Sequence, residues 1–449
     1  MEHRSVGMAF ALCACLLLCS GCGRQANLRP VDVVLVTVDT LRADHLGVYG
    51  ATGAPTPAID RFAAGALVFE RAVAPSSVTG PSLSTLLTSH YPQETKITDN
   101  GLPLPPGVLT LPDLLRRAGY STCAVLSNPV LRPPGDFPQG FDVYDTDLPQ
   151  AELARPQFKE RRADATTDRA LEVLKRRNPD RRLFLWVHYI DPHGPYAPPD
   201  ARPQMAPAGE PLVPLNSTNT GRGGIPKYQY IWNERSASLY RERYRQEIAF
   251  LDSHLARLFA ALDQPAIRDR TLVVFTADHG ESLGEHDYYF AHGEYLYPEL
   301  IDVPLVVRGP GLRSGRRRDL VGLVDILPSV AAYLRVPLRV PVRGAAVFER
   351  PVAEARTLLA AAYPGGSITD RFAAIRDDEE LIFSAPASME LLRGGTPVQV
   401  DARSARFTAF QAELKRLVEE NQLEGIDMRG RPVLTDEAAE RLRALGYIR

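Results

Sequence analysis

The sequence predicts an α/β fold: a large, mostly parallel sheet flanked by helices, followed by a small C-terminal unit of antiparallel sheet plus helix. Short, nearly continuous apolar runs rich in valine are typical of strands buried on both faces of a parallel sheet. Segments with helical periodicity alternate with these runs, as in α/β proteins. Dense proline around 337–351, followed by short strand-like runs, indicates a change of architecture near the end of the chain.

The alternating pattern extends over residues 31–345, which we interpret as one large domain. The predicted buried strands are Val31–Val38, Cys123–Leu126, Leu183–Val187, Leu272–Phe275 and Leu305–Val307. The predicted helices are Ala58–Ala64, Leu111–Ala118, Thr166–Arg176, Leu239–Leu262 and Val324–Tyr333. Helices between consecutive strands provide the crossovers that a parallel sheet requires.

Residues 346–449 are expected to form the C-terminal subdomain. Its predicted strands, joined by turns, are Thr357–Ala362, Phe372–Ile375 and Glu380–Phe383. Its predicted terminal helices are Phe407–Glu420 and Asp436–Leu445, and we interpret the second as a docked or solvated helix rather than a partner site.

The N-terminal segment is typical of a secreted protein. Basic residues precede the apolar run Val6–Cys19, which is too short to span a bilayer comfortably, so residues 1–22 are predicted to be a signal peptide. The stretch Leu18–Cys22 resembles a bacterial lipobox, in which Cys22 is lipidated after cleavage, and residues 23–30 form a polar tether. We therefore expect export to the bacterial cell envelope and a lipid anchor at Cys22. A plain signal peptide is the alternative.

The cysteine content and the net charge restrict which disulfide bonds and which partners the protein can have. Of the five cysteines, Cys22 and Cys123 would remain after cleavage, so a lipidated Cys22 leaves Cys123 without a disulfide partner. Its apolar surroundings in Ser121–Leu126 predict a buried structural thiol. The net charge of −2 and the lack of a basic stripe argue against a nucleic-acid partner.

Acidic and imidazole side chains stand at or just beyond the ends of several predicted strands. These residues are Asp39, His188, Asp191, His193, Asp278 and His279. Ligands of open parallel sheets bind at the carboxyl ends of the strands, so these side chains are expected to meet at one edge. For His188, packing beneath the site is as good an explanation as a functional role.

Thr79 lies before a predicted helix in the segment Ser76–Thr88, where Pro81 suits a first helical position. Free backbone N–H groups and the helix dipole favour an anion there. A threonine hydroxyl at this place can bind a metal, lose its proton and attack phosphorus or sulfur. An ordinary N-cap threonine is the alternative.

At this point several segments together resemble the sulfatase family in order and spacing. They are Val34–Gly50, Pro57–Thr88, Phe184–Pro199 and Thr276–Gly293, and the similarity extends from about Val31 to Gly344. The resemblance implies an alkaline-phosphatase-like fold and metal-dependent chemistry on esters in residues 31–345. It places Asp39 and Asp278 at the family's metal carboxylates, and Thr79 at its nucleophile.

The resemblance also assigns roles to histidines. His193 matches a histidine that contacts the oxyanion or leaving group of the substrate, and His292 lies near a substrate-contacting lysine of the family. His279 stands where sulfatases usually have asparagine. Two further histidines, His45 and His286, are interpreted as surface or supporting residues. Asn100 lies in a turn that approaches the site in relatives, although turn chemistry explains it equally well.

The departures from the family pattern concern the nucleophile. Sulfatases carry Cys or Ser in a Cys/Ser-x-Pro-x-Arg motif and oxidise it to formylglycine, whereas this chain reads Thr79-Gly80-Pro81-Ser82-Leu83. Threonine cannot give that aldehyde, so no formylglycine is expected. Leu83 replaces the motif arginine, and Thr40 replaces the second acidic metal ligand.

The predicted metal ligands are Asp39, Thr79, Asp278 and His279. Mixed oxygen and imidazole donors suit Zn²⁺ or Mn²⁺ better than Ca²⁺ or Mg²⁺. A second metal, held by Asp191, His193 and His292, remains open. The ligand pattern looks like that of the phosphotransferase and phosphodiesterase branches of the superfamily, in which a metal-bound threonine is transiently phosphorylated.

The sequence thus predicts an exported hydrolase of phosphate mono- or diesters, acting through Thr79 with His193 and His292 on a small-molecule or envelope ester. The alternatives are a transferase that passes a phospho-headgroup to an envelope glycan or lipid, a sulfuric ester hydrolase, and a catalytically inactive binding protein. The irregular segment Pro198–Ile231 is either a lid or specificity loop, or a solvated insertion.

Overall fold

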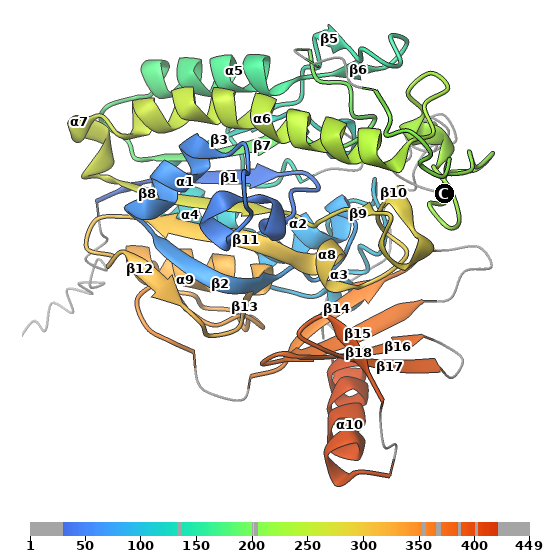
Figure 1. Cartoon of the computed structure of the whole chain (residues 1–449). Coiled ribbons are helices and arrows are strands. Elements are labelled where there is room, and N and C mark those ends of the chain that lie inside the picture. Colours follow the sequence, from blue (N-terminus) through green and yellow to red (C-terminus); the bar gives the residue numbers. More distant parts are fainter. Residues whose placement is uncertain are drawn as a thin grey trace, which may run out of the picture.

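The computed structural model describes residues 30–132, 137–199, 201, 205–352, 356–364, 370–384, 388–399 and 403–420. It confirms the predicted fold class: a mostly parallel central sheet between helices, with a separate antiparallel sheet near the C-terminus (Figure 1). The leader with Cys22 and the predicted helix Asp436–Leu445 lie outside the described residues.

The central sheet has the strand order β12-β2-β11-β8-β1-β7-β3-β4, and β13 pairs with β2. The bounds are β1 Asp32–Val38, β2 Leu67–Val73, β3 Ser121–Leu126, β4 Val143–Asp145, β7 Leu183–Tyr189, β8 Thr271–Ala277, β11 Asp302–Arg308, β12 Gly315–Arg317 and β13 Val321–Gly322. Strand β11 runs antiparallel to both β8 and β2, and the other pairings are parallel.

Strand β1 is central because its sequence is apolar enough to be buried on both faces. Every residue of β1 is buried, and its Val36 pairs with Val187 of β7 and Phe275 of β8. All five predicted strands of this sheet are confirmed. Strand β2 was missed, because the half-buried Glu70 and Arg71 interrupt its apolar run.

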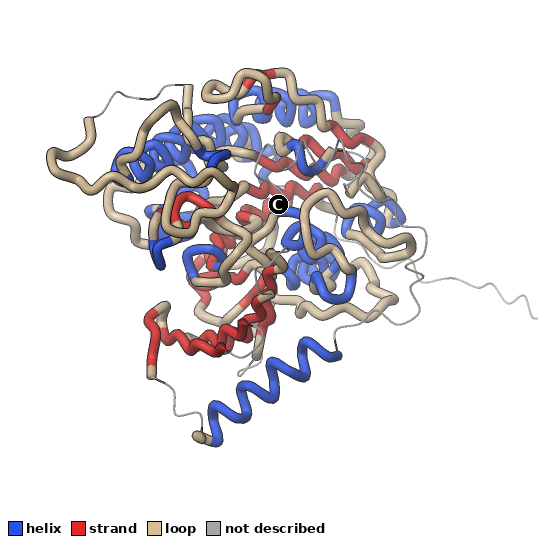
Figure 2. The backbone as a smooth tube through the Cα atoms, turned by 90° about the vertical axis from the view of Figure 1, so that its right-hand side faces the viewer, coloured by secondary structure: helices blue, strands red, loops and turns tan. Residues whose placement is uncertain are grey.

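Helices cover both faces of this sheet (Figures 1 and 2). On one face lie α1 Pro57–Ala64, α5 Ala163–Arg176 and α6 Ala237–Leu262. On the other lie α2 Thr79–Thr88, α4 Leu111–Arg117 and α9 Ile326–Leu334. Shorter helices are α3 Pro92–Thr95, α7 Pro265–Arg268 and α8 Pro298–Ile301. The sequence fixes some starts directly: the Ser236 hydroxyl accepts the Leu239 N–H at 3.2 Å and caps α6.

The C-terminal sheet is antiparallel, with its strands in sequence order. Its elements are β14 Leu358–Ala362, β15 Arg371–Arg376, β16 Glu379–Ser384, β17 Ser388–Arg393, β18 Thr396–Val398 and the helix α10 Ala405–Glu420. Helix α10 packs on β15 and lies below the C-terminal sheet in Figure 1. Strand β14 joins this sheet to the larger part, because Ala361 N donates to Pro75 O at 2.9 Å, close to the start of α2.

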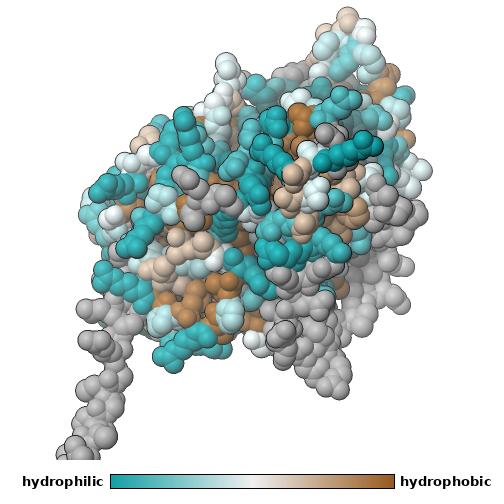
Figure 3. All heavy atoms as spheres, turned by 90° about the horizontal axis from the view of Figure 1, so that it is seen from below, coloured by the Kyte–Doolittle hydropathy of each residue, from teal (hydrophilic) through white to brown (hydrophobic). Residues whose placement is uncertain are grey.

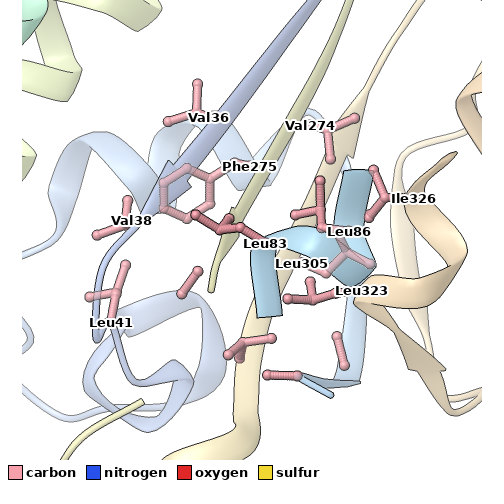
Figure 4. Close-up of a cluster of buried hydrophobic side chains, with 14 of the residues drawn as sticks. Val36, Val38, Leu41, Leu83, Leu86, Val274, Phe275, Leu305, Leu323 and Ile326 are labelled. Carbon is pink, nitrogen blue, oxygen red and sulfur yellow. The ribbon is translucent and has the colours of Figure 1, made fainter. Parts of the chain in front are cut away.

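Apolar side chains fill the space between the layers. Leu83 of α2, Val38 of β1 and Phe275 of β8 belong to one buried hydrophobic cluster (Figure 4). Cys123 is buried on β3 as predicted, and burial raises the pKa of its thiol to about 11. Seen from below, small groups of hydrophobic side chains lie between hydrophilic ones (Figure 3).

Among the described residues, we find no helix with the length and apolar character needed to cross a lipid bilayer.

The central position of β1 leads to a stability prediction. Leu35 is 1 % exposed at the centre of the sheet, so Leu35→Ala removes packed atoms and leaves a cavity, at a cost of about 2–5 kcal/mol in the free energy of unfolding. Val143→Ala, at an edge position that is 47 % exposed, is the control and should cost less than about 0.5 kcal/mol. Urea unfolding measures both, and equal losses would contradict the assignment of the core.

Candidate active site

The carboxyl ends of β1, β7 and β8 meet at one edge of the central sheet. Asp39 directly follows β1, and its N–H donates to Tyr189 O of β7 at 2.9 Å. Asp278 directly follows β8, and its N–H donates to Val38 O of β1 at 3.2 Å. Backbone pairing at the strand ends therefore sets the two aspartates next to each other.

Asp39, Asp278 and His279 form a candidate metal centre. Their ligand atoms lie within 4.8 Å of one another, and no other described cluster of His, Cys, Asp or Glu meets that condition. All three side chains are fully buried. Asp39 Oδ1 and Asp278 Oδ2 have no hydrogen-bond partner, which is rare for buried carboxylate oxygens. A divalent cation would satisfy both oxygens, so these residues fit a metal.

The hydrogen bonds of His279 prepare its ring for a metal. Its Nδ1 lies 2.9 Å from Gly280 O, an acceptor, so Nδ1 carries the proton and Nε2 presents a lone pair. Nε2 lies 3.6 Å from Asp278 Oδ2 and 3.8 Å from Asp39 Oδ1. The Thr79 hydroxyl lies 3.3 Å from the same nitrogen, so Thr79 lies beside the three charged ligands.

Without a cation, the charges of Asp39, Asp278 and His279 are not fully compensated by the surrounding protein, and their pKa values are shifted. Burial raises the pKa of Asp39, and it raises the pKa of Asp278 to about 6. Burial lowers the pKa of His279, but the two carboxylates outweigh that effect and hold it above its ordinary value. A bound dication would favour the ionised carboxylates and the neutral imidazole instead.

Thr79 lies at the N-terminus of α2, but it is the first helical residue rather than the residue before the helix. Its side chain is buried. The Ser82 hydroxyl donates to Asp278 O at 2.6 Å and ties this helix end to the metal centre. Asn100 does approach the site, because its Oδ1 accepts the Gly80 N–H at 2.7 Å.

The positions that depart from the family motif are also buried. Leu83 points into the hydrophobic core with Val38 and Phe275, so it cannot replace the guanidinium of the motif arginine (Figure 4). Thr40 lies beside the centre with its N–H 3.3 Å from Asp278 Oδ1, and its hydroxyl has no hydrogen-bond partner.

His193 and His292 lie beside the metal centre. The His292 ring is 4.6 Å from the His279 ring and 5.2 Å from the His193 ring, measured between centroids. His193 Nδ1 lies 2.7 Å from Gly194 O, and burial lowers the pKa of His193 to about 3, so its ring is neutral at neutral pH. His292 Nδ1 lies 3.1 Å from Glu281 Oε1, and burial raises the pKa of Glu281 to about 8.

His188 supports the centre from below. Trp186 Nε1 donates to the Thr37 hydroxyl at 2.9 Å, and that hydroxyl lies 2.8 Å from His188 Nδ1. A hydroxyl proton donated to Nδ1 leaves the ring proton on Nε2, which lies 3.7 Å from Asp39 Oδ2. Burial lowers the pKa of His188 to about 4, which keeps the ring neutral.

Among the described residues, Asp191, His193 and His292 do not come close enough together to form a second group of metal ligands. Asp191 lines a small pocket together with His193, Glu160 and Glu247. Burial raises the pKa of Asp191 to about 7, and burial with the nearby Asp191 and Glu152 raises that of Glu160 to about 9.

Sequence reasoning missed two polar residues that support the site. Asn128 Nδ2 donates to Asp39 Oδ2, and Glu281 contacts His292. Asn128 follows β3, which ends at the same sheet edge, so the strand-end rule that found Asp39 also applies to it. No comparable signal identifies Glu281.

The predicted loop Pro198–Ile231 is docked in its described part. Tyr289 N donates to Gly221 O at 2.8 Å, beside the hairpin β9 Ser282–Leu283 and β10 Tyr289–Ala291. Its Tyr228 ring lies 6.2 Å from the His193 ring, so the loop forms a wall of the site. His45 and His286 contact other partners: His45 lies 3.0 Å from Asp44, and His286 stacks on Tyr297.

The geometry of the centre predicts which aspartate holds a metal. Asp39→Asn should weaken binding of Zn²⁺ or Mn²⁺ at least about tenfold, because changes to residues that merely support metal ligands already cost that much. Asp191→Asn is the control and should retain that metal, since the Asp191 carboxylate lines the pocket with Glu160 and Glu247 and is not one of the proposed ligands of Zn²⁺ or Mn²⁺. Elemental analysis after dialysis measures both, and equal retention would contradict the proposed ligand set.

The acidic group around Asp191 predicts how stability depends on pH. The pKa of Glu160 rises from 4.5 in the unfolded chain to about 9 in the folded protein. The contribution of Glu160 to the free energy of unfolding is therefore fully present below about pH 4.5 and is lost as the pH rises towards 9. At pH 8, the free energy of unfolding of Glu160→Gln should therefore exceed that of the wild type by on the order of 2 kcal/mol, so the variant melts at a higher temperature, whereas at pH 5 the two should be alike.

Melting curves in EDTA measure this effect. Glu242→Gln on α6, a 31 % exposed side chain, is the control and should show no such pH dependence. A Glu160→Gln difference that stays constant between pH 5 and pH 8 would refute the assignment.

A family model described as sulfatase matches residues 31–336. The chain is 23% identical over 420 residues to an N-acetylglucosamine-6-O-sulfatase of Bacteroides thetaiotaomicron, covering 76% of this chain and 73% of that protein. It is 26% identical over 382 residues to the multifunctional alkaline phosphatase superfamily protein PehA of Trinickia caryophylli, covering 68% and 73%.

Solved structures share the fold. The phosphonate monoester hydrolase of Agrobacterium radiobacter superimposes with a TM-score of 0.69 at 18% sequence identity, covering 91% of this chain and 98% of that one. The family match spans the strands of the central sheet, the candidate metal centre and helix α2. The chain therefore belongs to the sulfatase family, and it is an ester-hydrolysing enzyme.

Proposed function

We propose that this enzyme hydrolyses phosphate mono- or diesters, with Thr79 as the nucleophile. The observation that carries the proposal is the position of the Thr79 hydroxyl, 3.3 Å from His279 Nε2 at the N-terminus of a helix. By the resemblance of its segment to the family motif, this hydroxyl would take the place of the formylglycine of sulfatases. The helix N-terminus favours the negative charge of a phosphoryl group there.

Asp39, Thr79, Asp278 and His279 would hold the metal. When bound, a divalent ion supplies Lewis-acid chemistry: it lowers the pKa of a hydroxyl and neutralises charge on phosphoryl oxygens. The donor set of carboxylate, hydroxyl and imidazole favours Zn²⁺ or Mn²⁺ over Ca²⁺ or Mg²⁺.

In the first step, Thr79 Oγ1 attacks phosphorus, and the bond from phosphorus to the leaving oxygen breaks. Backbone N–H groups at the start of α2 orient the phosphoryl oxygens. His292, oriented by Glu281, gives a proton to the leaving alkoxide, so a neutral alcohol departs, and the proton lost by Thr79 passes to His292, which regains its initial protonation state.

In the second step, water attacks the phosphorylated Thr79. The bond from phosphorus to Thr79 Oγ1 breaks, inorganic phosphate or a phosphomonoester leaves, and Thr79 regains its proton. His193 is neutral because burial lowers its pKa to about 3, so it can accept a hydrogen bond from the attacking water. Its place between Tyr228 and His292 holds that ring in position.

Sulfuric ester hydrolysis is the second candidate, because relatives such as the N-acetylglucosamine-6-O-sulfatase are named for sulfate esters. Two features of this chain favour phosphate instead. Thr79 does not permit formylglycine, and Leu83 leaves the nucleophile without the motif arginine because it lies in the core. The phosphonate monoester hydrolase with the same fold shows that phosphorus chemistry occurs on this architecture.

Thr79 variants test the proposal. Thr79→Ala should lower kcat/KM for 4-nitrophenyl phosphate or bis(4-nitrophenyl) phosphate at least about 1,000-fold, because no other group replaces the nucleophile. Thr79→Ser should retain part of the activity. Thr88→Ala, at the opposite end of α2, is the control and should remain active.

The same assay separates the alternatives. Full activity in Thr79→Ala would exclude the proposed nucleophile, and faster cleavage of 4-nitrophenyl sulfate than of either phosphate would favour the sulfatase alternative. An added alcohol that receives the phosphoryl group at the expense of free phosphate would indicate a transferase.

We also propose export and a lipid anchor at Cys22, which would hold the enzyme at the cell envelope. The basic and apolar leader and the lipobox-like Leu18–Cys22 support this proposal. A tether of residues 23–30 would then separate the membrane from the first strand.

A further inference from the structure

A small acidic pocket beside the candidate active site is lined by carboxylates from three parts of the chain. They belong to Glu160 at the end of β6 Lys159–Glu160, Asp191 two residues after β7, and Glu247 on α6. Strand β6 forms a short hairpin with β5 Gln150–Ala151, and this hairpin lies above α6 in Figure 1. Segments far apart in the sequence therefore bring these three carboxylates to one place.

The acidic pocket contains an internal space next to a carboxylate oxygen that lacks a partner. The volume of the cavity is about 20 Å³, which is enough for one water molecule or one ion. Asp191 is 6 % exposed, and its Oδ2 has no hydrogen-bond partner, which is rare for a buried polar atom. A carboxylate oxygen only accepts, so the cavity suits a hydrogen-bond donor or a cation.

The charges around the cavity favour a cation over a neutral water molecule. Glu152 also lines the pocket, but Arg155 Nε donates to Glu152 Oε2 at 2.7 Å and compensates its charge. Among the described residues that line the pocket, Arg162 is the one arginine or lysine left, and its guanidinium also lies 3.6 Å from Asp164. When ionised, the three carboxylates therefore carry more negative charge than their surroundings compensate.

The pKa values of the three carboxylates agree with this excess of negative charge. Burial raises the pKa of Asp191 to about 7, and burial with Asp191 and Glu152 raises that of Glu160 to about 9. Burial, Asp191 and Glu160 raise the pKa of Glu247 well above its ordinary value. A bound dication would favour the ionised form of all three side chains.

We propose that Glu160, Asp191 and Glu247 bind one Ca²⁺ ion at a site separate from the candidate metal centre. All their donor atoms are oxygens, which Ca²⁺ prefers, whereas the imidazole of the centre suits Zn²⁺ or Mn²⁺. Their oxygens do not all lie within 4.8 Å of one another, so the ion takes water ligands as well. Ca²⁺ tolerates such irregular coordination better than Mg²⁺ does.

This site would join the hairpin of β5 and β6 to the turn after β7 and to α6. His193 lines the same pocket, so the ion would bind next to the candidate active site without taking part in the chemistry there. The inference does not depend on the proposed function.

Binding of Ca²⁺ to Asp39→Asn protein tests the site, because this variant lacks a ligand of the candidate metal centre. After treatment with EDTA and dialysis against radioactive Ca²⁺ at pH 8, it should bind one ion per chain. Adding Glu160→Gln or Asp191→Asn should weaken that binding at least about tenfold, since changes that merely support metal ligands already cost that much. An equal concentration of Mg²⁺ should leave most of the Ca²⁺ bound.

Glu242→Gln, added to Asp39→Asn, is the matched control. Glu242 lies on the same helix as Glu247 but does not line the pocket, and its side chain is 31 % exposed. This variant should keep the affinity for Ca²⁺. Absence of Ca²⁺ binding by Asp39→Asn, or an affinity that neither pocket replacement changes, would overturn the inference. Displacement by Mg²⁺ would refute the choice of ion.

Melting curves answer the same question if Asp39→Asn does not fold. At pH 8, Ca²⁺ several-fold above its Kd should raise the Tm of the wild type by about 2 °C more than that of Glu160→Gln. An ion at the candidate metal centre would stabilise both proteins alike and cancels in this comparison. Equal shifts would contradict the site. Catalytic activity enters neither measurement, so a failure of the proposed function leaves both results interpretable.

Discussion

Two carboxylates buried side by side are the constraint on which the rest of the site depends. Asp39 and Asp278 follow neighbouring parallel strands, so the register of the sheet brings like charges together where little water reaches them. Such a pair is unfavourable unless a cation or a proton compensates it. The hydrogen bonds around the pair therefore determine which oxygens remain available for a cation.

In each of the two carboxylates, one oxygen accepts hydrogen bonds from the protein and the other oxygen faces the candidate metal site. Asp278 Oδ1 accepts the backbone N–H groups of Thr40 and His279, at 3.3 Å and 2.8 Å, while Asp39 Oδ2 accepts from Asn128. The remaining oxygens, Oδ2 of Asp278 and Oδ1 of Asp39, face His279 Nε2. This division of roles is preorganisation: the ligand atoms are oriented before any ion arrives.

Much of the architecture could be predicted from the sequence, since continuous apolar strands such as β1 have no other stable environment than the centre of a sheet. The strand-end rule also located Asp39, Asp278 and His279. Strand β2 was not predicted because Glu70 and Arg71 make its sequence look amphipathic. In addition, its antiparallel partner β11 pairs with it across a shift of register near Pro304. Contacts between distant segments, such as that of Arg371 with Glu294, leave no periodic trace.

The direction of the Leu83 side chain has a consequence for how this enzyme could change. A guanidinium at that position would have to enter an apolar cluster of Val38 and Phe275, where an unpaired charge is strongly unfavourable. Restoring cysteine at position 79 and arginine at position 83 would therefore not by itself rebuild the formylglycine motif, because the core around α2 would have to be reshaped first. The hydrophobic core around Leu83 therefore favours the proposed chemistry, in which the hydroxyl of Thr79 stays unmodified.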